Sequence, residues 1–131
     1  MTTTDPTTET GWPVSGLFLE ALANRDFSAL SACLAPDVHF RGLIPPGPFD
    51  AEGADATEAR FRQWFGGGDS FEVLDASAGR LGAKLYLRWR IRMCDADGAA
   101  RVAEQHVFAT ASDRIDSLDL LCSGWNPESM P

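Results

Sequence analysis

The 131-residue sequence contains no long apolar run and no excess of basic residues. No stretch approaches the roughly 20 apolar residues that a membrane-spanning helix requires. Acidic residues outnumber basic ones by 19 to 11, which gives a net charge of −8 and a pI near 4.5. Such a chain repels phosphate backbones and anionic lipid surfaces, so we expect neither a nucleic acid nor a membrane as its partner.

Cysteine and histidine are also scarce. The three cysteines, Cys33, Cys94 and Cys122, are odd in number and widely spaced, which argues against a disulfide framework or a zinc site. The two histidines, His39 and His106, lie far apart and the carboxylates are scattered, so no metal or other cofactor is expected. Reduced thiols and the lack of a secretory signal pattern predict a cytoplasmic protein.

The length leaves room for one domain. The first ten residues hold six threonines and no apolar core, so residues 1–12 are predicted to form a disordered tail. No internal repeat or linker divides the remainder. We therefore expect a single domain over residues 13–126.

Three helices are predicted in the first half of the chain. Apolar residues in 14–22 recur at the spacing of one helical face. Asp26 is suited to cap a second helix that includes Leu34. Asp55 begins a sequence that resembles a capping box for a third helix, which the glycines at 66–68 would end.

Alternation of apolar and polar residues predicts strands in the rest of the chain. A short strand is expected at 38–42, followed by a loop at the proline-rich residues 45–48. Phe71 and Val73 mark another strand. The clearest alternation covers residues 85–93.

The last two strands follow a turn at Asp97-Gly98, which is a strong signal for a two-residue hairpin. The first of them covers residues 102–109. The second runs from Ile115 to about Cys122. The predicted order of elements is ααβαββββ, which is an α+β domain with its helices first and an antiparallel sheet after them.

This order and several segments resemble the nuclear transport factor 2-like superfamily, which includes ketosteroid isomerases, SnoaL-like polyketide cyclases and limonene epoxide hydrolase-like proteins. The segments are LFLEALANRDFSALSACLAPDVHF, EARFRQWF, VAEQHVFAT and DRIDSLDLLCSGW. The resemblance covers about residues 14–125. It implies a cystatin-like fold, in which a curved antiparallel sheet wraps as a cone around the N-terminal helices and a deep pocket. It also implies dimerisation through the outer face of the sheet.

The catalytic residues of the isomerases do not carry over by this resemblance. Their oxyanion-donating Tyr on the first helix is matched by Phe18, their general-base Asp by Gly42, and their protonated Asp by His106. Asp37 and Arg41 have no third partner that would complete an epoxide-hydrolase set. SnoaL-like cyclases use a pocket Asp or His on the later strands, so His106 stays a candidate by resemblance.

Glu104 and His106 form the best candidate catalytic pair. Residues two apart on a strand point to the same face, with Cα atoms about 6.5–7 Å apart, so the two side chains can touch. A carboxylate beside an imidazole favours the charged ring and selects its tautomer, which suits acid–base chemistry near neutral pH. Because Val102 and Phe108 share this face, we predict that it points inward. The alternatives are a buried pair that only sets strand register and a face exposed to water.

The predicted pocket is aromatic, although each of its residues could equally belong to the core. Its predicted lining comprises Phe18, Phe40, Phe61, Trp64, Trp89, Phe108 and Cys122. His39 alternates out of phase with its apolar neighbours and is expected on the outer side. Arg88, Arg90 and Arg92 are expected on the outer surface of the sheet, where they could meet carboxylates of a partner subunit. An anionic-substrate pocket is the alternative for these arginines.

Together these observations predict a SnoaL-like small-molecule enzyme, an isomerase, cyclase or hydro-lyase that needs no cofactor. His106 would shuttle a proton and Glu104 would orient it, in a pocket for a small apolar or weakly polar molecule. The alternative is a non-catalytic small-molecule-binding or dimerisation module of the same fold, which the missing isomerase residues favour. A homodimer through the outer sheet face is expected.

Overall fold

The computed structural model describes residues 12–45 and 47–127. Its helices are α2 (Trp12–Ala23), α3 (Phe27–Ala32) and α4 (Ala54–Phe65). Its strands are β1 (Leu34–Ile44), β2 (Gly47–Glu52), β3 (Ser70–Leu81), β4 (Lys84–Cys94), β5 (Ala100–Ala111), β6 (Ile115–Cys122) and β7 (Asn126–Pro127). Apart from Trp12, the predicted tail lies outside the described residues. No helix among them is long and apolar enough to cross a membrane.

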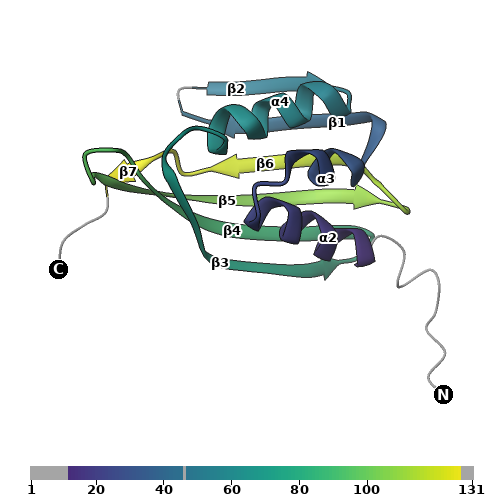
Figure 1. Ribbon diagram of the computed structural model, residues 1–131. Helices are drawn as coiled ribbons and strands as arrows, with labels where there is room; N and C mark the ends of the chain where they lie inside the picture. The colour runs from purple at the N-terminus through teal and green to yellow at the C-terminus, as the bar shows by residue number, and fades with distance from the viewer. Residues whose placement is uncertain (1–11, 46, 128–131) are drawn as a thin grey trace, which may run out of the picture.

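The three helices lie on one face of a curved, open sheet, which confirms the predicted α+β class (Figure 1). The strands follow the order β2-β1-β6-β5-β4-β3, and the short β7 pairs with β5. The sheet is mixed because β1 runs parallel to β6, whereas the other neighbours are antiparallel. The edge strand β2 was not expected, since the proline-rich residues 45–48 predict a loop. Pro48 is tolerated there because an edge strand can leave a backbone position unpaired.

The helix boundaries follow from local chemistry. The Asp26 side chain accepts a hydrogen bond from Ala29 N at 3.1 Å, which confirms the predicted cap of α3. The expected extension of this helix to Leu34 is wrong. The Cys33 carbonyl accepts a hydrogen bond from Ile115 N at 2.8 Å instead, so the chain joins β6 and Leu34 begins β1. Asp55 lies in the first turn of α4 and does not cap it, since the N-cap residue is Gly53.

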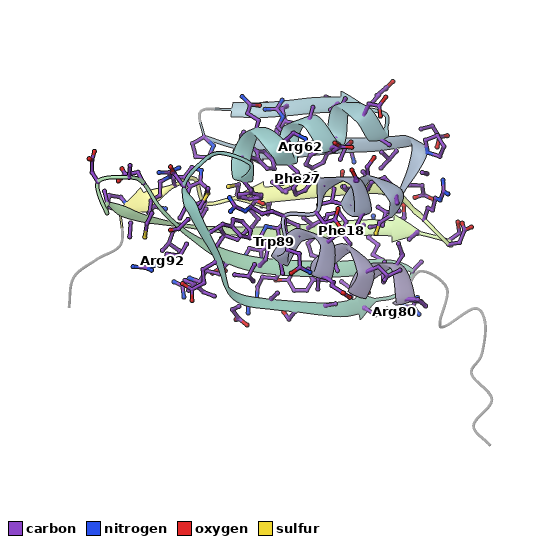
Figure 2. All side chains as sticks on the ribbon, in the orientation of Figure 1. Phe18, Phe27, Arg62, Arg80, Trp89 and Arg92 are labelled. Atoms are coloured by element: carbon purple, nitrogen blue, oxygen red, sulfur yellow. The ribbon has the colours of Figure 1, made fainter. Side chains whose placement is uncertain are left out.

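The space between the helices and the sheet is filled by aromatic rings. Phe61 on α4 lies at the centre, with ring centroids 5.7 Å from Phe18, 5.4 Å from Phe40 and 6.1 Å from Trp89. Figure 2 shows Phe18 and Trp89 between α2 and the sheet. All four side chains have no exposed surface. The middle of the molecule is therefore a packed core, and any binding site must lie at its ends or on its outer face.

Candidate functional site

Strands β4 and β5 decide which side chains face the helices. On β4, Leu87 and Trp89 are buried, and they pair with Val107 and Gln105 of β5, which are also buried. The opposite face of β5 carries Glu104, His106 and Phe108. The prediction that Glu104 and His106 point inward is therefore wrong. They lie on the outer face of the sheet, away from the helices.

The predicted contact between Glu104 and His106 is present on that outer face. His106 Nε2 lies 2.6 Å from Glu104 Oε2, and His106 Nδ1 lies 2.5 Å from the hydroxyl of Tyr86 on β4. Both ring nitrogens are thus occupied. In the neutral ring, Nε2–H donates to the carboxylate and Nδ1 accepts from the Tyr86 hydroxyl. We call this arrangement the Tyr86–His106–Glu104 chain.

This chain borders an open hollow of about 830 Å³ on the outer face, hereafter the outer hollow. Its lining is Leu74, Arg90, Val102, Glu104, His106, Leu121, Cys122, Ser123, Asn126 and Pro127. The side chains of Glu104 and His106 are each 34% exposed. The candidate acid–base pair consequently lies in a wet groove and not in the apolar pocket that was predicted for it.

The arginine row lies on the outer face, as predicted. Arg88 pairs with Asp75, Arg90 Nε lies 3.7 Å from Glu104, and Arg92 lies 3.8 Å from Glu72. The hydrogen bond from Arg88, together with its charge, holds the pKa of the Asp75 carboxyl below its usual range. The carboxylates that neutralise the row belong to the same sheet.

A smaller and more enclosed cavity of about 360 Å³ lies on the helix side of the sheet, hereafter the inner cavity. It lies where the C-terminal end of α4 meets the ends of β1 and β6. It is lined by Ile44, Pro45, Trp64, Phe65, Ala103, Gln105, Cys122, Ser123, Gly124, Trp125 and Asn126. Trp64 and Cys122, two of the residues predicted to line a pocket, both border this cavity.

Four of the residues predicted to line a pocket do not do so. Phe18, Phe40, Phe61 and Trp89 are 0% exposed, so they offer no surface to a ligand. Each is large and apolar and is packed against other rings, which is the usual place for such side chains. Phe108 is 36% exposed on the outer face, because it alternates in phase with Glu104 and His106 along β5.

Gln105 is a buried polar side chain in the lining of the inner cavity, and the sequence pattern did not single it out. It is 2% exposed, and its Oε1 accepts a hydrogen bond from Trp89 Nε1 at 2.7 Å. Its Nε2 donates to Cys122 Sγ at 3.3 Å. In the sequence Gln105 alternates in phase with Ala103 and Val107, but the opposite face carries Val102 and Phe108, so this pattern alone does not show which face is buried.

The position that resemblance matched to a general base is blocked. A Cβ atom on Gly42 would lie 2.2 Å from the ring of Phe49, its neighbour on β2. That ring is held edge-on against Phe40 and Trp64, with Arg60 above it at 4.4 Å. Phe49 therefore occupies the space that a catalytic side chain at position 42 would need.

His39 lies on the outer side of β1, as expected. Its Nε2 is 2.8 Å from Asp50 Oδ1, and Glu52 is close enough that ligand atoms of all three residues lie within 4.8 Å of one another. The His39–Asp50 ion pair alone accounts for the short distances among these three residues, and the carboxylates of Asp50 and Glu52 are exposed. The three cysteines, Cys33, Cys94 and Cys122, form no disulfide with one another.

An open sheet curved around three helices, with a small cavity at one end, defines the nuclear transport factor 2-like α+β fold. The model of the SnoaL-like domain matches residues 16–117. The chain belongs to this SnoaL-like family. A comparison with curated protein sequences finds no match.

Solved structures support the same fold. A putative polyketide cyclase from Xanthomonas campestris pv. campestris is 17% identical, with a TM-score of 0.70 over 89% of this chain and 92% of that one. An LEH-like epoxide hydrolase of M. tuberculosis is 21% identical, with a TM-score of 0.67 over 91% and 86%. An NTF2-like protein from Burkholderia xenovorans LB400 is 12% identical, with a TM-score of 0.63 over 86% and 88%. At such identities the likeness concerns the fold.

Proposed function

We propose that the chain binds a small, uncharged, apolar or weakly polar molecule in the inner cavity and does not transform it there. The observation that carries this proposal is the lining, which combines the partly exposed rings of Trp64 and Trp125 with the buried Gln105 amide and, among the described residues, no charged side chain. Acid–base catalysis needs a group that exchanges a proton with the substrate. Among the described residues, the lining offers only the Cys122 thiol and the Ser123 hydroxyl, while Glu104 and His106 lie on the opposite face of the sheet. This lining suits binding better than acid–base catalysis.

Titration with N-phenyl-1-naphthylamine, a neutral fluorescent probe, tests this proposal. Trp64 and Trp125 line the cavity, so a bound probe is expected to quench tryptophan emission by energy transfer. Ala103→Leu adds bulk to a buried wall and is expected to abolish this binding. Ala59→Leu, the same change at an exposed position of α4, serves as the matched control. Equal probe binding by both variants would show that the inner cavity is not the site.

A second function is supported by the Tyr86–His106–Glu104 chain, and it retains the predicted acid–base pair. Because Glu104 holds the ring by Nε2–H, the Nδ1 atom that accepts the Tyr86 hydrogen bond could also take the Tyr86 proton, which would leave a phenolate near Arg88. A tyrosine activated in this way can act as a base or nucleophile. We propose that this chain would then process a small molecule in the outer hollow as a cofactor-independent enzyme.

Hydrolysis of p-nitrophenyl acetate reports on such reactivity. If the second function holds, the wild-type rate should fall to the uncatalysed rate in His106→Ala and in Tyr86→Phe. His39→Ala removes the other histidine of the chain and should leave the rate unchanged. Equal rates in His106→Ala and the wild type would eliminate this second function.

We also propose that the protein forms a homodimer through the outer face of the sheet. This face carries four large apolar side chains with substantial exposure. They are Leu43, Leu74, Phe108 and Leu121. Contiguous exposed apolar surface on a soluble domain is typical of an interaction site. A second copy on this face would also cover the outer hollow, so the dimer favours the binding function over the enzymatic one.

A further inference from the structure

The orientation of the Gln105 amide is determined by its neighbour. An indole nitrogen can only donate a hydrogen bond, so the amide atom that faces Trp89 Nε1 at 2.7 Å must be the oxygen. The amide nitrogen therefore lies on the other side, next to Cys122 Sγ at 3.3 Å. Oxygen and nitrogen of an amide are commonly interchangeable in a structure, but here the hydrogen-bond network removes the ambiguity.

The Gln105 amide nitrogen retains hydrogen-bonding capacity. It carries two hydrogens, and its one acceptor among the described residues is a sulfur, which accepts weakly. The same sulfur also receives the backbone N–H of Gly124 at 3.3 Å, so two donors share it. A buried donor with so poor an acceptor gains free energy when an oxygen atom reaches it.

The other residues that line the inner cavity restrict which kind of ligand can supply that oxygen. Trp64 and Trp125 present partly exposed ring surfaces, and none of the described side chains in the lining carries a full charge. An ionised ligand would lose its hydration without gaining a counter-charge from the side chains that line the cavity. A purely apolar ligand would leave the Gln105 N–H without an oxygen acceptor.

We propose that the ligand of the inner cavity is an uncharged, ring-containing molecule with one exposed acceptor oxygen, such as a ketone, lactone or ester. Its oxygen accepts a hydrogen bond from Gln105 Nε2, and its apolar body contacts the aromatic walls. This inference rests on the proposed binding function and names the chemical class of its ligand. Gln105 is the residue that determines this specificity.

A pair of isosteric probes tests the inference. 2-Acetylnaphthalene carries a carbonyl group where 2-isopropenylnaphthalene carries a C=CH₂ group of similar size. Without a donor in the cavity the hydrocarbon should bind at least as tightly, because it loses less hydration on entry. With the Gln105 donor, the ketone should bind about fivefold tighter, which is the typical net effect of one hydrogen bond.

Affinities are measured by NMR titration of the ¹⁵N-labelled protein, in which the side-chain amide signals of Gln105 report the contact directly. The ketone is expected to shift these signals more than the hydrocarbon does. Gln105→Leu should abolish the preference for the ketone while retaining hydrocarbon binding. Gln63→Leu makes the same change at the other glutamine of the chain, which is exposed on α4, and should preserve the preference.

The outcomes separate the two levels of the proposal. If both probes shift the signals of cavity residues and bind with equal affinity, the proposed class of ligand is wrong and the binding function stands. If neither probe shifts them, the binding function and the inference both fail. The comparison within the wild-type protein remains decisive even if Gln105→Leu does not fold.

Discussion

At the scale of single residues, the Phe49 ring fills the space beside Gly42, the position that the resemblance matched to a general base. The two residues are directly paired between β1 and β2. Only glycine at position 42 leaves room for the Phe49 ring, and three neighbouring groups hold that ring in place. The glycine at position 42, where the isomerases carry an Asp, and the Phe49 ring beside it are thus parts of the same packing arrangement.

Gly42→Ala should accordingly lower the free energy of unfolding by about 1–3 kcal/mol, because the added methyl overlaps a ring that is packed on several sides. Urea unfolding monitored by circular dichroism measures the change. In a Phe49→Ala background the same substitution should cost far less, since the overlapping ring is gone. An equal cost in both backgrounds would contradict the steric explanation.

Gly16→Ala is the matched control for this experiment. Gly16 lies inside α2, and a Cβ there would meet nothing within 4 Å. An alanine in a helix interior is more favourable than glycine by roughly 0.5–1 kcal/mol, so this variant should be slightly more stable than the wild type. Gly42→Ala should therefore lower the free energy of unfolding, whereas Gly16→Ala should raise it.

At the scale of elements, the register of the β4–β5 hairpin explains why Glu104 and His106 lie on the outer face of the sheet and not on the inner one. A two-residue turn at Asp97-Gly98 would place Trp89 opposite His106, so that His106 shared the buried face of β4. The structure instead has a three-residue loop, because Asp95 N donates to the Ala99 carbonyl at 3.1 Å and Gly98 adopts a φ of +83°. Trp89 then pairs with Gln105. One residue of register exchanges the two faces of a strand.

Much of the fold was nevertheless predictable from local pattern. The alternation in 85–93 matches β4, the cap at Asp26 matches the start of α3, and the outward arginines match the observed face. These features depend on residues that are close in the sequence.

The unpredicted features depend on contacts between distant parts of the chain. Strand β2 exists because β1 pairs with it despite Pro48, and α3 stops early because Ile115 captures the Cys33 carbonyl. The inner cavity needs the hairpin register before Gln105 can be placed in it. Periodicity alone showed the contact between Glu104 and His106 but could not tell which side of the sheet they occupy.

At the scale of the whole molecule, charge and apolar surface are distributed unevenly. The chain has a net charge of −8, yet on the outer face arginines pair with carboxylates at Arg41–Asp119, Arg88–Asp75, Arg90–Glu104 and Arg92–Glu72. These pairs cancel much of the local charge around the exposed leucines. Two such faces can approach with less electrostatic repulsion than the net charge suggests.

Size-exclusion chromatography with light scattering should consequently give twice the chain mass of 14.2 kDa. Leu121→Glu places a charge at the centre of the apolar face, where the wild-type residue is 52% exposed, and should yield the monomer. Leu17→Glu introduces the same charge at a 58% exposed position on α2 and should leave the dimer intact. A monomeric wild-type protein would rule out the dimer.

The two edge strands have a consequence for how this protein behaves at high concentration. The edge strand β2 carries Pro48, and the opposite edge strand β3 has a register shift between Val73 and Asp75. A proline and an irregular strand both hinder the addition of a further strand, which is the first step of sheet-to-sheet polymerisation. The sheet is thereby protected against growing into fibrils from its sides, and concentrated solutions should resist amyloid formation.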